Sequence, residues 1–155
     1  MNIEEAIAEV RPQLLALLGP NRYEAHVRLV PHMPEYEQAF TGEMAGVVRR
    51  AYEFRPIAPL REYAKPDQTE LVIGGSFAET LGTDPAAAQF FAHGWQPFLP
   101  HLVPGRIWLG WKFIAPGARL GMAYDGLVRV DRRWVWIPKP WKALRHTSPD
   151  AANLG

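Results

Sequence analysis

Four apolar runs separated by turn residues occupy residues 106–138 and constrain the fold more than any other feature of the sequence. The runs are RIWLGWKFIA, ARLGMAY, LVRV and WVWI, and the turn residues between them are Pro116-Gly117, Asp125-Gly126 and Asp131-Arg132-Arg133. Asp-Gly between two alternating runs is a strong short-range signal for a β-hairpin. We therefore predict an antiparallel meander of four strands over these residues.

The N-terminus carries the signals of a helix. Apolar residues recur at spacings of three and four over residues 3–18, which is typical of one buried helical face. Asn2, with Glu5 three residues later, predicts a capping box. The Gly-Pro pair at 19–20 predicts the end of the helix, and Pro12 predicts either a kink or two abutting helices.

Three further elements are predicted before residue 80. Residues 22–30, RYEAHVRLV, alternate between apolar and polar side chains, which predicts a half-buried strand. Residues 34–51 begin with proline and continue with apolar residues at helical spacing, so we predict a helix there. Residues 70–77, ELVIGGSF, predict a short strand, and their Gly74-Gly75 pair indicates a bulge or a close backbone approach.

A short helix and an apolar loop are expected next. Asp84 as N-cap, Pro85 at the first position and Gly94 past the end bracket the predicted helix PAAAQFFAH. Residues 94–105 are too rich in proline for regular structure. We nevertheless expect their apolar side chains to be packed, namely Trp95, Phe98, Leu99 and Leu102.

These elements predict an α+β fold, in which N-terminal helices and one or two strands pack on a C-terminal four-stranded antiparallel meander. Fifteen prolines and thirteen glycines argue against a simple helical bundle. A chain of 155 residues is long enough to bury the core of one ordinary domain. We expect residues 1–147 to form a single domain and residues 148–155 to form a frayed tail.

Composition excludes several classes of function. Because the chain contains no cysteine, it has no disulfide framework, thiolate nucleophile or cysteine-ligated zinc. Its acidic, amphipathic N-terminus is unlike a secretory signal. No apolar run reaches the roughly eighteen residues that a transmembrane helix needs. We therefore expect a cytoplasmic protein.

The charges are distributed unevenly along the chain. Residues 1–105 contain eight Lys and Arg against thirteen Asp and Glu, whereas residues 106–146 contain nine Lys and Arg against Asp125 and Asp131 alone. Such asymmetry indicates an anionic partner for the basic half. The alternative is that the two halves face each other and neutralise their charges within the fold.

No motif for catalysis, nucleotide binding or metal binding is present. Ser76 lacks the second glycine of a nucleophile elbow, no phosphate-binding loop occurs, and the five histidines are scattered. We therefore predict no catalytic residue, no cofactor and no metal. An acid/base pocket is still conceivable from the available ionisable residues, which are Glu79, His93, His101, Tyr124 and Asp125.

The stretch RVDRRWVWIPKPWK at 129–142 is the best candidate for a binding site. Trp134 and Trp136 lie within a predicted strand and should hold the sheet together. Trp141 follows the last strand, on a segment that Pro138 and Pro140 should keep extended and partly exposed. The predicted partner-binding residues are Arg132, Arg133, Lys139, Trp141, Lys142 and Arg145.

Three functions are compatible with this surface. The leading hypothesis is a non-enzymatic interaction protein, an accessory subunit or neutralising partner, that binds an acidic protein surface, because Trp and Arg are enriched at binding hot spots. The first alternative is a single-stranded nucleic-acid-binding domain, whose aromatic residues stack on bases. The second alternative is a small pocket enzyme without a cofactor, such as a hydrolase or isomerase.

Overall fold

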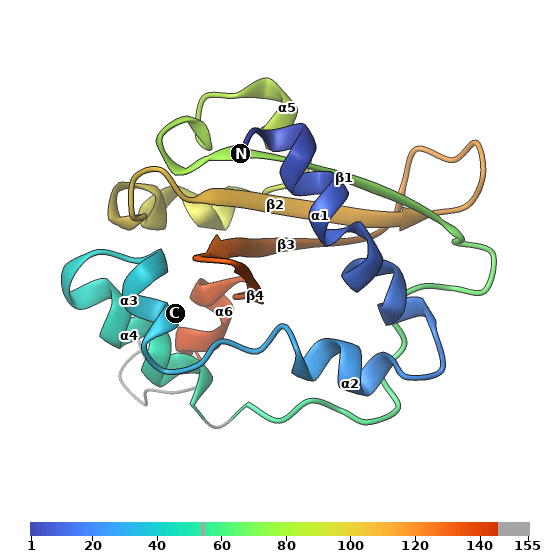
Figure 1. Cartoon of the computed structure of the whole chain (residues 1–155), viewed down its shortest axis with the longest axis horizontal. Helices are drawn as coiled ribbons and strands as arrows, with labels where there is room; N and C mark the ends of the chain where they lie inside the picture. The colour runs from blue at the N-terminus through green and yellow to red at the C-terminus, as the bar shows by residue number, and fades with distance from the viewer. Residues whose placement is uncertain (54, 146–155) are drawn as a thin grey trace.

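The computed structural model describes residues 1–53 and 55–145, with only the backbone of residue 145. Figure 1 shows a four-stranded sheet with helices packed around it. The helices are α1 (Ile3–Leu15), η1 (Ala16–Leu18, 3₁₀), α2 (Arg22–Val27), α3 (Glu35–Ala39), α4 (Gly42–Tyr52), η2 (Ala78–Thr80, 3₁₀), α5 (Pro85–Ala88), η3 (His93–His101, 3₁₀) and α6 (Pro140–Arg145). The strands are β1 (Glu70–Phe77), β2 (Ile107–Ile114), β3 (Gly121–Val130) and β4 (Arg133–Trp136).

The predicted fold class is confirmed. The four strands are antiparallel and neighbour one another in chain order, β1-β2-β3-β4, which makes the sheet a meander. Three consecutive antiparallel strands lie within residues 106–138, as the turn signals predicted. The expected frayed tail, 148–155, lies outside the described residues, so the predicted extent of the domain stays a prediction.

The Asp125-Gly126 pair forms a bulge inside one long strand, so the predicted hairpin was wrong. Trp111 pairs with Tyr124 and Leu109 with Leu127, so two residues of β3 oppose one residue of β2. Gly126 has a φ of 89°, and a β-bulge, like a tight hairpin turn, favours glycine for a positive φ. The same dipeptide therefore suits either structure.

The fourth strand of the sheet is β1, which pairs with β2. It lies outside residues 106–138, the region for which four strands were predicted. Its two glycines allow neighbouring groups to approach closely, as one of the two sequence interpretations predicted. A Cβ atom on Gly74 would lie 2.3 Å from the ring of Phe90, and one on Gly75 would lie 2.0 Å from the carbonyl oxygen of Trp108. Side chains at these positions would push away the segment after α5, which carries Phe90, and strand β2.

The first helix agrees with the sequence signals. The N–H of Glu5 donates to Oδ1 of Asn2 at 2.8 Å, and the Glu5 carboxylate accepts from the N–H of Asn2, which completes the predicted capping box. Helix α1 runs through Pro12 without interruption and is followed by the 3₁₀ turn η1. The helix buries Ala6, Val10 and Leu14 against the sheet.

Residues 22–30 do not form the predicted strand. Residues 22–27 are helix α2, because the same letters also satisfy a helical period. Ala25 and Leu29, four residues apart, are buried, while Tyr23, Val27 and Val30 lie on an exposed side with 40–44% of their surface accessible. A short alternating run therefore cannot discriminate the two periods.

The helix predicted over 34–51 is interrupted. Helix α3 ends at Ala39, and Phe40 instead forms an isolated bridge with Leu102. The N–H of Thr41 donates to the carbonyl of His101 at 2.7 Å, and Gly42 then adopts a φ of 57°. These contacts with a distant segment replace the local hydrogen bonds that a continuous helix would need.

The segment between β1 and β2 is more regular than predicted. The N–H of Ala86 donates to Asp84 Oδ1 at 2.9 Å, which confirms the N-cap, but α5 has only four residues. Residues 93–101 form the 3₁₀ helix η3 in spite of two prolines. The expectation of an irregular loop was wrong there, whereas Trp95, Phe98 and Leu102 are buried as predicted.

The sheet separates two apolar clusters. The α1-side cluster lies between the sheet and helices α1, η1 and α2, and its aromatic members are Tyr63, Trp111, Phe113, Tyr124, Trp134 and Trp136. The α6-side cluster lies between the sheet and α3, α4, η3 and α6, and its buried aromatic members are Tyr36, Phe40, Trp95, Phe98 and Trp108. The predicted role of Trp134 and Trp136 in the core is thus consistent with the structure.

Candidate interaction surface

The segment after β4 turns sharply and then forms a helix. Lys139 adopts a φ of 48°, and Pro140 begins α6, where its missing N–H would be unpaired in any case. The extended conformation predicted for this segment was therefore wrong. The physical reason is that proline suits the first turn of a helix as well as an extended chain.

Trp141 is anchored on its inner side. Its ring lies edge-on to Trp95, with centroids 5.8 Å apart at 83°, and tilted to Phe98, with centroids 6.4 Å apart. A Cβ atom on Gly94 would lie 2.3 Å from this ring, so glycine makes the approach of α6 to η3 possible. Trp141 is half-buried, and its exposed part is held in one orientation by these contacts.

Lys139 and Lys142 lie on either side of Trp141 in the sequence and close to a buried carboxyl group. Asp125 has 4% of its surface exposed, and its Oδ2 accepts from the N–H of Ala92 at 3.1 Å. Burial raises the pKa of Asp125, and the Trp95 indole, the Ala92 N–H and the two lysines oppose this effect only in part. The two lysines thus add positive charge near a carboxyl group whose pKa is raised.

The segment after α4 supplies a further cation, Arg55, that sequence reasoning missed. The hydroxyl of Tyr52 donates to the carbonyl of Pro138, which fastens the end of α4 to the start of the α6 segment. The guanidinium of Arg55 lies 6.0 Å from the centre of the Tyr52 ring. We define the α6 surface as Lys139, Trp141, Lys142 and Arg55. No sequence signal links Arg55 to α6, because the link is a tertiary hydrogen bond.

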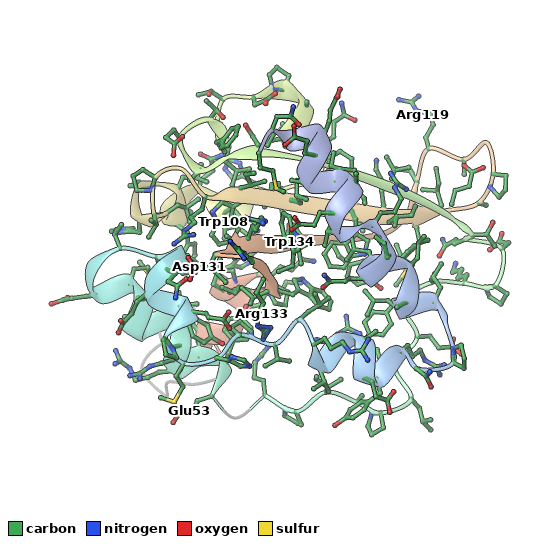
Figure 2. The ribbon with its side chains drawn as sticks, in the orientation of Figure 1. Glu53, Trp108, Arg119, Asp131, Arg133 and Trp134 are labelled. Carbon is green, nitrogen blue, oxygen red and sulfur yellow. The ribbon has the colours of Figure 1, made fainter. Side chains whose placement is uncertain are left out.

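The other predicted partner-binding residues lie elsewhere or are already engaged. Arg132 is exposed at the turn before β4, and Lys139 follows the end of β4, about 13 Å further along a four-residue strand. Arg133 donates to the carbonyls of Arg28 and Val30 and lies 3.3 Å from a carboxylate oxygen of Glu35. Figure 2 shows Arg133 beside the segment that leads to α3. The side chain of Arg145 lies outside the described part of the chain.

The charges of the two halves of the sequence are partly neutralised within the fold. Arg129 pairs with Glu9 at 2.9 Å, and Arg133 pairs with Glu35. Each pair joins the basic half to the acidic half. In contrast, Lys139 and Lys142 have no ion pair with a carboxylate within the ranges that the structure describes. Neutralisation within the fold therefore accounts for Arg129 and Arg133, whereas an anionic partner for Lys139 and Lys142 stays a prediction.

The residues considered for an acid/base pocket are dispersed. His93 and His101 lie at opposite ends of η3, about 16 Å apart at the rise of a 3₁₀ helix. The Glu79 carboxylate accepts from the N–H of Gly105. Tyr124 packs into the α1-side cluster, whereas Asp125 contacts Ala92 on the other side of the sheet. The side chain of Ser76 is buried beside Thr80.

Within 1–53 and 55–145, no three His, Asp or Glu side chains gather closely enough to hold a metal ion. Over the same ranges no helix combines the length and apolar character that crossing a membrane requires.

Comparison of the chain with protein-family models found no match. Comparisons with curated proteins and with solved structures found none either.

Proposed function

We propose that this protein is a non-enzymatic interaction protein, an accessory subunit or neutralising partner, which binds an acidic protein surface through the α6 surface. The observation that carries this proposal is the state of Trp141, which is half-exposed yet anchored against Trp95 and Phe98. A tryptophan already held in one orientation loses little conformational entropy when a partner covers it.

The charges around Trp141 favour an acidic partner. Lys142 is exposed and Lys139 is half-buried. Arg55 is also exposed, and it contacts the ring of Tyr52, whose hydroxyl donates to the carbonyl of Pro138. Because Lys139 and Lys142 have no ion pair within the described residues, a partner carboxylate could approach them without displacing one. Tryptophan and arginine are enriched at binding hot spots, and cations around such an anchor steer an acidic partner toward it.

Arg132 and Arg145, which the sequence predicted as partner-binding residues, are proposed as peripheral contacts of the same partner. Arg132 is exposed at the end of β4 remote from α6. Arg133 would contribute less than predicted to binding, because its guanidinium already contacts the 28–35 segment. Contacts at the rim of an interface chiefly affect the rate of association.

The proposal can be tested by capture of partners from a cell lysate, with charge reversal on and away from the α6 surface. Lys142→Glu should reduce the capture of acidic proteins at least about 10-fold, because it places like charges in contact. Arg119→Glu is the matched control. Arg119 is exposed on the β2–β3 loop, at the far end of β3 from Arg133 (Figure 2), and should be neutral when reversed. Equal capture by both variants would refute the proposal.

The nucleic-acid alternative is tested by the anisotropy of a labelled single-stranded oligonucleotide of mixed sequence. We expect only non-specific binding, with a dissociation constant of roughly 10⁻⁴–10⁻⁶ M at physiological salt. A tighter dissociation constant that weakens steeply with salt and is lost in Lys142→Glu would assign the α6 surface to nucleic acid instead.

A further inference from the structure

The guanidinium of Arg61 lies over three aromatic rings on the opposite side of the sheet from α6. Its central carbon is 4.9 Å from the ring centre of Tyr63, 5.6 Å from that of Trp136 and 5.9 Å from that of Tyr124. All three distances are within the range of a cation–π interaction. We call these three rings the aromatic cage.

The rings of the cage stand at steep angles to one another. Tyr124 and Trp136 are nearly perpendicular, at 86°, with centroids 5.6 Å apart. Tyr63 is inclined by about 55° to each of the other two rings. Rings that enclose a point from three directions present their negative faces to it, and this arrangement favours a cation at that point.

Neighbouring contacts hold the cage in place. The hydroxyl of Tyr124 donates to the carbonyl of Tyr63 at 2.7 Å. His26 shares a hydrogen bond with the hydroxyl of Tyr63, and its ring lies 4.7 Å from that of Trp136. Burial, followed by the charge of Arg61, lowers the pKa of His26 to about 4. His26 is therefore neutral at pH 7 and does not repel a cation in the cage.

The cation in the cage is held by the three rings and by a hydrogen bond to the side chain of Tyr124, without an ion pair among the described residues. The three ring residues are at most 9% exposed, whereas Arg61 is exposed. The backbone of Arg61 is fixed, because its carbonyl accepts from Arg22 Nε at 2.7 Å. Its side chain has no ion pair with any carboxylate of the described residues. Rotation of that side chain alone would expose the faces of the rings.

Space for the remainder of a ligand lies next to the cage. A hollow of about 290 Å³ is lined by Tyr63 itself together with Leu17, Leu18, Arg22 and Glu62, among others. A ligand with its cationic group in the cage could place its remaining atoms in this hollow.

We propose that the aromatic cage binds the methylated ammonium group of an external ligand and that Arg61 is its built-in competitor. A strongly hydrated primary ammonium or metal ion would need carboxylate oxygens to replace its water. Among the described residues, no carboxylate pairs with the cation that occupies the cage. A quaternary ammonium is weakly hydrated and is recognised by aromatic rings alone. The source is either a free molecule such as choline or a trimethylated lysine of another protein.

The test is a calorimetric titration of the purified chain and its Arg61→Ala variant. Choline is one probe, and its neutral isostere 3,3-dimethyl-1-butanol is the control ligand. Removal of the competitor should increase the affinity for choline at least about 10-fold and should leave the isostere without measurable binding. Arg119→Ala, an exposed arginine remote from the cage, should match the wild type. A trimethyllysine peptide and its unmethylated form distinguish the two sources.

Three results would overturn the proposal. The first is an unchanged affinity for choline in Arg61→Ala, and the second is equal binding of the neutral isostere. The third is an equal gain in Arg119→Ala. If Arg61→Ala fails to fold, Arg61→Gln retains most of the length of the side chain without its charge and is held to the same outcomes. The proposal is independent of the α6 surface, so either can fail without the other.

Discussion

The two aromatic clusters on opposite faces of the sheet differ in the group that lies between the cluster and the solvent. On the α1 side the outermost group is a cation, because the guanidinium of Arg61 covers the rings of Tyr63 and Trp136. On the α6 side the outermost group is itself aromatic, because Trp141 lies half-buried over Trp95. We propose that the first arrangement binds a cationic ligand that displaces Arg61 and that the second binds a partner that covers Trp141.

The two sides also differ in the kind of ionisable group that they bury. His26, on the α1 side, has a pKa lowered to about 4, and Asp125, on the α6 side, has a raised pKa. Burial is the largest cause of both shifts, because it disfavours the charged form of any group. An acid and a base therefore respond in opposite directions to the same physical effect.

The largest expected effect distinguishes a tryptophan within a cluster from one at its edge. Trp134 is 1% exposed and donates from Nε1 to Glu9 at 2.7 Å, so Trp134→Ala should lower the free energy of unfolding by about 3–5 kcal/mol. Trp141→Ala should cost about 1–2 kcal/mol, because its ring is only half-buried. Urea denaturation of both variants measures the difference.

A matched variant separates packing from hydrogen bonding. Trp134→Phe keeps an aromatic ring but removes the N–H, and it should lose clearly less stability than Trp134→Ala. If Trp141→Ala destabilises the fold as much as Trp134→Ala does, Trp141 belongs to the core and the α6 surface loses its anchor.

A second prediction concerns Asp125→Asn. Since the folded state raises the pKa of Asp125 above its ordinary value of 3.8, Asp125 stabilises the fold below that pH and destabilises it as the pH rises through the folded pKa. Asparagine cannot ionise, so the variant should be more stable than the wild type at pH 7, by about 1 kcal/mol. Thermal melts at pH 4 and pH 7 measure the gain, and lower stability of the variant at pH 7 would contradict the interpretation.

The pH dependence of stability that His26 contributes is expected to have the opposite sign to that of Asp125. Its folded pKa of about 4 is below its ordinary value of 6.5, so its contribution is present above pH 6.5 and is lost as the pH falls toward 4. His26→Gln should remove this dependence, an effect of about 1 kcal/mol or less because the side chain is partly exposed. Arg61 is the charged group that faces His26, so Arg61→Ala should raise the pKa of His26 in an NMR titration. An unchanged pKa would place Arg61 away from the ring.

Several failures of sequence interpretation have one cause. The residues 22–30 satisfy both the strand and the helix period, Asp125-Gly126 suits both a hairpin and a bulge, and Pro140 suits both an extended chain and a helix start. In each case the local preferences permit two structures of similar energy. Contacts with distant parts of the chain, such as the hydrogen bond from the Ile137 N–H to the Gly126 carbonyl, select one of them.

The sequence alone determined the α+β class, the antiparallel order of the C-terminal strands, the capping box of Asn2 and the N-cap Asp84. These features depend on hydrophobic period and on hydrogen bonds between residues two or three positions apart. Such signals are local, so the sequence is sufficient to predict them. The tertiary structure alone decided that Trp141 packs against Gly94 and that the guanidinium of Arg61 lies over the rings of Tyr124 and Trp136. Those contacts join segments far apart in the chain, and only the packing of helices on the sheet brings them within a few ångströms of each other.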